Sequence, residues 1–164
     1  AYLVHDVRLV RFDDACPRPV NPAYAGTTRA TTLYADGYPV LVIGQASLDD
    51  LNDRLADRGA PALPMNRFRP NVVVDGLDAY DEDHVDTLRV GDVVLTLVKP
   101  CTRCEITTTD QETGRRLQEP LRTLSTYRRD DRLAGVTFGM NAIVAAGAGA
   151  SIRVGTTAEA ALRF

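Results

Sequence analysis

Two cysteines at the end of an apolar stretch form the clearest chemical motif of the chain. They are Cys101 and Cys104, and Arg103 lies between them. A neighbouring cation favours the thiolate, which is the form of cysteine that binds metals and attacks electrophiles. The motif is therefore a candidate thiol or metal site.

The flanking sequence predicts two strands around this motif. Residues 93–98 are apolar or β-branched and follow the Gly91-Asp92 turn signal, as is typical of a buried strand. Residues 106–109 are again mostly β-branched, and the turn-like residues 110–114 follow them. We therefore expect the cysteines on a tight connection between two strands.

Three other interpretations of the cysteines remain open. A structural zinc site needs four Cys or His ligands, and the further candidates Cys16, His5 and His84 are not paired at ligand spacing. A thioredoxin-like redox motif requires a helix after the cysteines, whereas strand-like sequence follows here. Inert core cysteines are the third interpretation, against which the polar neighbours Thr102 and Arg103 argue.

Composition restricts the class of protein. The 164 residues are 45% hydrophobic and 25% charged, which is ordinary for one globular domain. A net charge of −3 does not recommend nucleic acid as a partner. No apolar run approaches the ~20 residues of a membrane span. Three cysteines make no disulfide framework, so we expect a reducing, cytoplasmic setting. No signal peptide is visible, and the missing initiator Met suggests an excised domain.

Further short strands and two helices are predicted along the chain. Ser47 with Asp50 matches a capping box at the start of a helix, in which Leu48, Leu51 and Leu55 recur at helical spacing. Such a helix start after a strand is also a natural anion site. Pro120 is expected to begin the second helix. The proline-rich residues 13–28 and the Ala/Gly residues 145–150 are expected as loops, and the remaining strands at 4–12, 31–34, 39–43, 72–74, 143–144 and 152–154.

Two arginines precede the strand at 72–74. In an extended segment Arg67 and Arg69 would point to the same side, beside Asn66 and Asn71. The guanidinium fork suits phosphate or carboxylate, so this cluster is a candidate ligand site, although a surface ion pair is the simpler alternative. The acidic residues 78–86 lack the pattern of a calcium loop and are expected to be a solvated surface.

The element order favours a β-rich α+β fold. Many short strands without regular βα alternation indicate a closed or partly closed barrel with a few short helices. Functional groups would then lie on loops at its rim.

Several longer motifs resemble the MOSC domain, the molybdenum cofactor sulfurase C-terminal domain family, nearest the branch of the amidoxime-reducing components and their bacterial relatives. The matching stretches cover residues 66–76, 88–92, 99–104, 108–114 and 138–141, in order and at suitable separations. The resemblance covers residues 4–155. It implies a MOSC-type mixed β-barrel as a single domain over residues 1–164, without the upstream β-rich module of that branch.

The resemblance also implies a cofactor and its ligands. The cofactor would be the pyranopterin molybdenum cofactor (molybdopterin), with chemistry independent of pyridoxal phosphate, and Cys104 would be the protein ligand to the metal. A soft thiolate suits such a metal. The resemblance further places Asp110 near the metal, although a turn-forming role is equally open. The cofactor-binding positions that it implies are Arg67, Arg69, Asn71, Thr102, Ser47 and Asn141.

The implied activity is reduction of small N-hydroxylated or other N-oxygenated compounds by an oxidoreductase. No cysteine follows Cys104, so electrons would come from a separate donor, a ferredoxin- or flavin-type reductase. Two alternatives remain: a sulfur-carrier or cofactor-maturation module that reduces no substrate, and a zinc- or thiol-based binding module.

Overall fold

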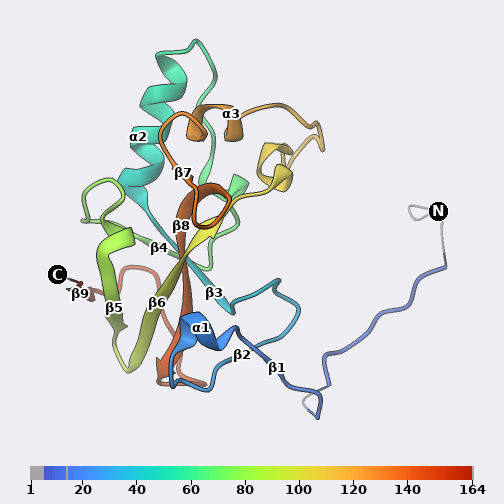
Figure 1. The fold of residues 1–164 in the computed structure, drawn as a ribbon, viewed down its shortest axis with the longest axis vertical. Coiled ribbons are helices and arrows are strands. Elements are labelled where there is room, and N and C mark those ends of the chain that lie inside the picture. Colours follow the sequence, from blue (N-terminus) through green and yellow to red (C-terminus); the bar gives the residue numbers. More distant parts are fainter. Residues whose placement is uncertain (1–5, 14, 164) are drawn as a thin grey trace.

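A curled, mostly antiparallel sheet forms the centre of the molecule (Figure 1). The computed structural model describes residues 6–13 and 15–163. In spatial order the sheet contains β4 (Val72–Val74), β3 (Val40–Gly44), β8 (Gly135–Ala146), β6 (Val93–Thr102), β5 (Val85–Val90) and β9 (Ala158–Leu162), and β7 (Arg129–Asp130) pairs with β8. Only β3 and β4 run parallel among these pairs. The predicted β-rich, barrel-like fold is confirmed.

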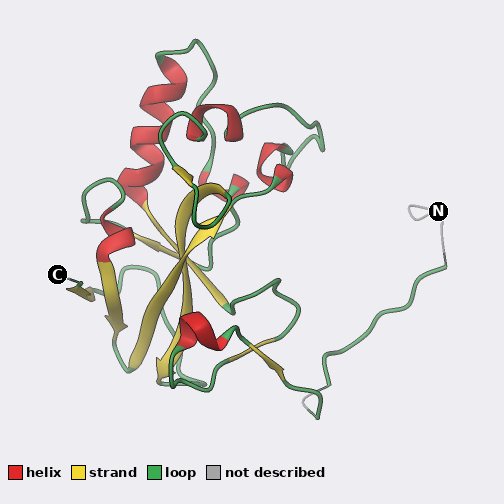
Figure 2. Cartoon of the chain, viewed as in Figure 1, coloured by secondary structure: helices red, strands yellow, loops and turns green. Residues whose placement is uncertain are grey.

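The remaining elements are short (Figure 2). A separate ladder joins β1 (Arg18–Pro19) and β2 (Thr31–Thr32). The α-helices are α1 (Pro22–Ala25), α2 (Gln45–Ala56) and α3 (Leu121–Leu124), and the 3-10 helices are η1 (Met65–Arg67), η2 (Asp81–His84) and η3 (Glu105–Thr108). Among the described helices, none is long and apolar enough to cross a membrane.

The sheet curls because its two longest strands pair irregularly. The register between β6 and β8 shifts at three places, between Val94 and Leu95, between Leu97 and Lys99, and between Pro100 and Thr102. Each irregularity bends the strands and increases their local twist. The last shift lies beside Cys101, so the cysteine segment leaves the sheet where the pairing is already disrupted.

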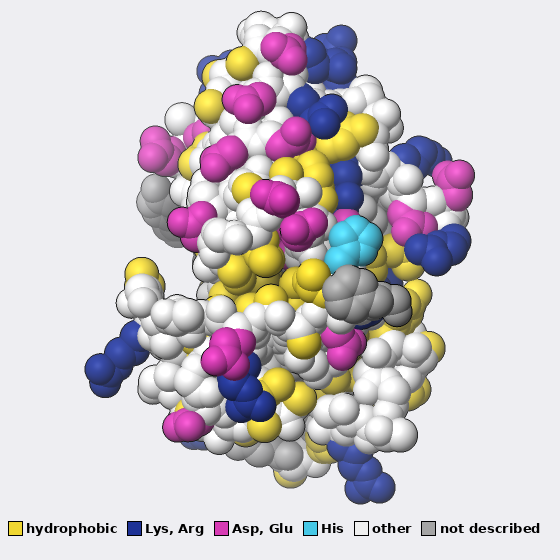
Figure 3. Space-filling view, turned by 90° about the vertical axis from the view of Figure 1, so that its left-hand side faces the viewer, with side chains coloured by type: hydrophobic (Ala, Val, Ile, Leu, Met, Phe, Trp, Pro, Cys, Tyr) yellow, Lys and Arg dark blue, Asp and Glu magenta, His cyan; other side chains and the backbone are white. Residues whose placement is uncertain are grey.

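The hydrophobic core has one large cluster on each side of the sheet. The cluster nearest the helices holds Leu51, Leu55, Phe68 and Phe138, all nearly inaccessible to solvent. The predicted apolar face of α2 is therefore confirmed. Figure 3 shows acidic side chains over the upper part of the molecule, where α2 lies. The other cluster lies on the inner, concave face and is built from β3, β4, β5, β6 and β8, including Leu88 and Leu95.

Several predicted elements are wrong. The expected loop at 13–28 contains β1 and α1, whose first turn begins at Pro22 after the Asn21 cap. Residues 6–12 form no strand and run away from the body of the molecule (Figure 1), while residues 4 and 5 of that prediction lie outside the described residues. Residues 152–154 are exposed loop and turn instead of a strand. The true last strand is β9, which the sequence left unassigned and which pairs with β5. The loop predicted at 145–150 begins only at residue 147, because β8 continues to Ala146.

Candidate functional site

The two cysteines occupy different elements. Cys101 lies within β6 and is half-buried, whereas Cys104 is the N-terminal cap of η3 and is an exposed, free thiol. The predicted strand at 106–109 is wrong, since residues 105–108 form this 3-10 helix. The hydroxyl of Thr107 donates to the carbonyl of Cys104 (3.0 Å), and such local side-chain bonds compete with strand pairing.

Arg103 binds the first cysteine rather than the second. Its Nη1 donates to the Sγ of Cys101 (3.0 Å), and its Nη2 donates to the carbonyl of Phe68 (2.7 Å). The guanidinium also lies over the Phe68 ring, 5.5 Å from its centroid. Arg103 therefore ties the cysteine segment to the loop that carries Arg67 and Arg69, and leaves Cys104 free of this contact.

Arg67 provides a second tie between the same two segments. It lies at the end of η1 with its side chain only 3% exposed. Its Nη2 donates to Oδ2 of Asp110 (2.9 Å) and its Nη1 to the carbonyl of Thr108 (3.4 Å). The buried Nε atoms of Arg67 and Arg103 have no hydrogen-bond partner among the described residues. A guanidinium buried with an unused donor is a polar group that a ligand could satisfy.

The prediction that Arg67 and Arg69 point to the same side is wrong. The segment is not extended, because Arg67 belongs to η1 and Arg69 has a φ of 57°. Arg67 is buried and Arg69 is exposed. Arg69 takes part in none of the ion pairs among described residues, so its guanidinium stays available to an anion.

Asp110 shapes the turn after η3. Its Oδ1 accepts hydrogen bonds from the N–H groups of Glu112 and Thr113 and from the Thr113 hydroxyl (2.7 Å). These bonds from Thr113 lower the pKa of Asp110, and the Arg67 guanidinium contributes a smaller effect in the same direction. The carboxylate is therefore a turn-forming anion and the partner of Arg67, and a role at a metal stays a prediction.

Asn71 and Asn141 lie in one row across the sheet. The backbone N–H and the side-chain Oδ1 of Asn71 bond to the carbonyl and N–H of Leu41. Leu41 is in turn the register partner of Asn141, which also lies opposite Lys99 on β6. Asn141 Nδ2 donates weakly to the Pro100 carbonyl (3.5 Å). This row ends next to Cys101, so the structure brings both asparagines to the level at which the cysteine segment begins.

Ser47 does not cap α2, so the predicted capping box is wrong. The cap is Gly44, and Ser47 lies in the first turn, fully buried. Its hydroxyl donates to Oε2 of Glu82 (2.6 Å) and accepts from the N–H of Tyr80 (2.8 Å). Glu82 Oε1 also accepts from the N–H of Gly44 (3.1 Å). A side chain of the protein therefore occupies the anion site expected at this helix start.

The sequence pattern did not indicate that Glu82 is a buried residue that bonds to the start of α2. It belongs to the acidic stretch 78–86, for which a solvated surface is expected from the sequence, yet it is inaccessible to solvent. Burial raises the pKa of Glu82, and the hydrogen bonds from Ser47 and Gly44 oppose this effect. No local signal distinguishes it from Asp81 and Asp83, because its partners lie more than thirty residues away in the chain.

The candidate site therefore gathers part of the predicted set. Arg67, Arg103 and Asp110 join the 66–71 loop to the cysteine segment, and Thr102 is exposed at the end of β6 beside Cys104. Ser47 is buried in another network. Among residues 6–13 and 15–163, no three His, Cys, Asp or Glu side chains come together to hold a metal ion.

Comparison with known proteins identifies relatives for most of the chain. The family model described as "MOSC domain" matches residues 29–159. The human mitochondrial amidoxime-reducing component 1 is 46% identical over 127 residues, which are 76% of this chain and 36% of that protein. The rat mitochondrial amidoxime reducing component 2 is 40% identical over 129 residues, 76% of this chain and 37% of that protein.

A relative with a different name also matches. The molybdenum cofactor sulfurase of Oryza sativa subsp. japonica is 40% identical over 120 residues, 69% of this chain and 14% of that protein. The chain thus spans about a third of the length of the amidoxime-reducing relatives and a smaller share of the sulfurase.

Proposed function

Because the chain belongs to the MOSC domain family, on the branch of the amidoxime-reducing components, we propose that it binds the molybdenum cofactor and reduces N-oxygenated compounds. The observation that carries this proposal is the exposed thiol of Cys104 in the motif that resembles the family. Its segment is held on one side by the bond of Arg103 to Phe68 and on the other by the bond of Arg67 to Asp110. The names of the relatives, which concern amidoxime reduction and the molybdenum cofactor, point in the same direction.

The residues of the site fit such a group chemically. An exposed thiol can supply one soft ligand, and a metal held by a single protein ligand needs its other ligands from a cofactor. The buried, unused Nε atoms of Arg67 and Arg103 and the exposed guanidinium of Arg69 are donors suited to an anionic cofactor. Cys104 would bind the metal, and Arg69, Asn71, Thr102 and Asn141 would line the cofactor.

When bound, the cofactor would supply a two-electron redox change at the metal. The chain itself would hold and orient it. Arg103 and Arg67 fix the cysteine segment against the 66–71 loop, so the Cys104 thiol is presented from a supported turn. Asp110 would act by holding Arg67 in place. Ser47 supports the fold of α2 and is not proposed to touch the cofactor.

The test is turnover of a model amidoxime by protein purified from a host that makes the cofactor, with a reduced viologen dye as electron donor. We expect reduction by the unchanged chain and by Cys101→Ser, and at least a hundredfold loss in Cys104→Ala, since removing a metal ligand removes the metal. Equal activity in all three proteins would contradict the proposal.

A second function is favoured by the likeness to a molybdenum cofactor sulfurase. The chain would then carry or mature the cofactor without reducing a substrate. Cofactor binding together with transfer to an acceptor enzyme, but no amidoxime turnover, would support it over the first function.

The proposed reductase function also concerns the source of electrons and the cellular setting. Electrons would come from a separate donor protein of the ferredoxin or flavin-reductase type, since the chain holds only three cysteines. The cytoplasmic setting stays a prediction, as the animal relatives are named as mitochondrial.

A further inference from the structure

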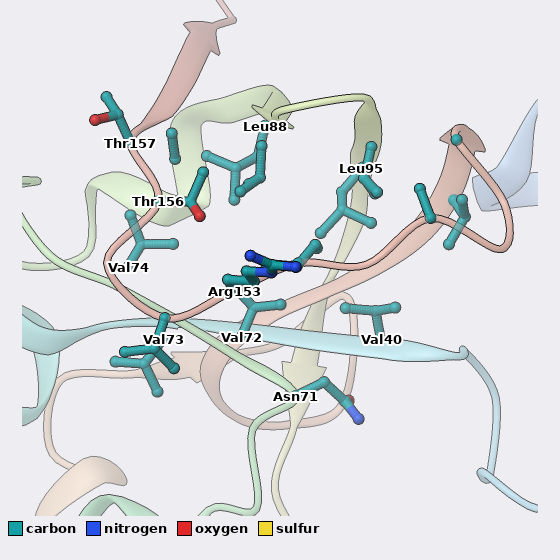
Figure 4. A pocket seen from close by; sticks show the side chains of 18 of the residues that line it. Val40, Asn71, Val72, Val73, Val74, Leu88, Leu95, Arg153, Thr156 and Thr157 are labelled. Atoms are coloured by element: carbon teal, nitrogen blue, oxygen red, sulfur yellow. The ribbon is translucent and has the colours of Figure 1, made fainter.

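A cavity of about 910 Å³ opens on the concave face of the sheet (Figure 4). Its walls come from β3, β4, β5, β6 and β8, and the segment 147–157, which connects β8 to β9, forms the remaining wall together with Ala158 at the start of β9. Among the residues assigned above to the cofactor, only Asn71 reaches its lining. The volume falls within the ~300–1,000 Å³ of ordinary ligand sites.

Most of the cavity wall is aliphatic. Leu88, Val93 and Leu95 contribute buried side chains from the β5–β6 hairpin, and Val72 and Val74 face them from β4. Segment 147–157 adds two exposed apolar side chains to the lining, Ile152 and Val154, at 41% and 108% relative exposure. A mostly apolar lining is typical of ligand-binding cavities.

One cation is placed over this apolar wall. Arg153 is among the residues that line the cavity, and Figure 4 shows its guanidinium amid the labelled aliphatic side chains. Arg153 joins none of the ion pairs among the described residues. The hydroxyl residues Thr156 and Thr157 also line the cavity. The acidic residue of the lining, Asp75, accepts a hydrogen bond from the N–H of Gly76 (2.8 Å).

We propose that this cavity binds an elongated aliphatic ligand ending in a carboxylate, such as a fatty acid. The aliphatic chain would lie against the valines and leucines, where it leaves water. The carboxylate would pair with the otherwise unused fork of Arg153, which is shaped for bidentate contact with carboxylates. The site is separate from the cysteine segment and does not depend on the function proposed for it.

The test measures, by isothermal titration calorimetry, how dodecanoate binds to the 164-residue chain. Dodecanol, which has the same aliphatic length and no charge, is the matched probe. We expect saturable binding of dodecanoate. Arg153→Gln should weaken dodecanoate about tenfold, because it removes a charged hydrogen-bond partner, and leave dodecanol unchanged. Arg129→Gln, which alters an arginine with a 66% exposed side chain outside the cavity, is the matched control and should have no effect.

A second variant tests the location of the aliphatic chain. Val72→Phe fills the cavity from β4 and should weaken both probes. Absence of saturable dodecanoate binding would overturn the proposal, and so would an equal effect of Arg153→Gln on both probes. If Val72→Phe fails to fold, the Arg153→Gln comparison alone decides the matter.

Discussion

Single residues at the site are fixed by close contacts that leave little room for change. Gly139, in the strand that carries Asn141, is the sharpest example. Its φ is +74°, and a Cβ there would lie 2.6 Å from a side-chain carbon of Ile43 and 2.8 Å from the carbonyl oxygen of Val42. Both the backbone conformation and the space around it exclude a side chain.

We therefore predict that Gly139→Ala destabilises the fold by about 2–4 kcal/mol, the sum of left-handed strain and overpacking. The measurement is urea unfolding. Gly114→Ala is the matched control, because Gly114 has a similar φ of +70° and nothing within 4 Å of the added Cβ. It should cost only about 1 kcal/mol. Equal costs at the two positions would show that the contact with β3 is unimportant.

Arg67 is the second residue with a measurable role. Arg67→Met removes its bonds to Asp110 and Thr108 and should lower the free energy of unfolding by about 2 kcal/mol, as expected for hydrogen bonds of a charged group. Arg116→Met breaks an ion pair to Glu105 in which both side chains are more than 60% exposed, so it should cost less than about 0.5 kcal/mol. A larger loss of unfolding free energy in Arg116→Met than in Arg67→Met would contradict the role assigned to the bonds of Arg67.

At the scale of elements, α2 is held by a contact that no local pattern reveals. Its first turn is covered by Glu82, which accepts hydrogen bonds from Gly44 and Ser47. A Cβ at Gly44 would approach Oε2 of Glu82 to 2.9 Å, so the carboxyl group fits closely against the glycine. The pair fixes η2 against the start of α2.

The burial of Glu82 makes the stability of the fold depend on pH. The pKa of Glu82 is raised by burial above its ordinary 4.5, so the folded chain retains a proton that the unfolded chain loses. The stabilisation that this bound proton gives to the folded state is complete below pH 4.5. It declines as the pH rises from there to the raised pKa that Glu82 has in the folded chain. One such group changes the free energy of unfolding by at most about 1.4 kcal/mol per pH unit.

Glu82→Gln cannot ionise, so we predict that this decline with rising pH disappears in the variant. Urea unfolding at a series of pH values from about 4 upward measures it. Glu112→Gln, at an exposed position after η3, should keep the decline of the unchanged chain. The assignment fails if Glu82→Gln shows the same pH dependence as the unchanged chain.

For the whole molecule, some of the strands and the helix face were predictable from the sequence, whereas β5 was not assigned and only residues 143–144 of the twelve-residue β8 were expected as a strand. Apolar runs located β3, β4 and β6, and leucine spacing located the buried face of α2. These signals succeed because burial on a sheet or along a helix imposes a period on the sequence. The edge strand β9 (Ala158–Leu162) was not predicted, because its sequence is rich in alanine, which has a low strand propensity. It forms a strand by pairing with β5.

The sequence suggested residues for the candidate site, and their role there stays a prediction, but it did not indicate how they are arranged. The motifs pointed to Arg67, Cys104 and Asp110. Nothing in the local sequence, however, indicates that Arg67 is buried or that it bonds to Asp110, which lies more than forty residues further along the chain. Likewise the β-branched residues after Cys104 suggested a strand. The hydroxyls of Thr107 and Thr108 instead bond back to nearby carbonyls and favour a helical turn.

Binding of the cofactor through Cys104 is tested by the molybdenum content of the chain after expression in a host that makes the cofactor. Three proteins are compared: the unchanged chain, Cys104→Ser, and Cys101→Ser as the matched control on the other side of Arg103. We predict about one molybdenum per chain in the unchanged protein and in Cys101→Ser, and none in Cys104→Ser, because only the exposed thiol is assigned to the metal. Molybdenum retained in Cys104→Ser, or absent from all three proteins, would contradict the account.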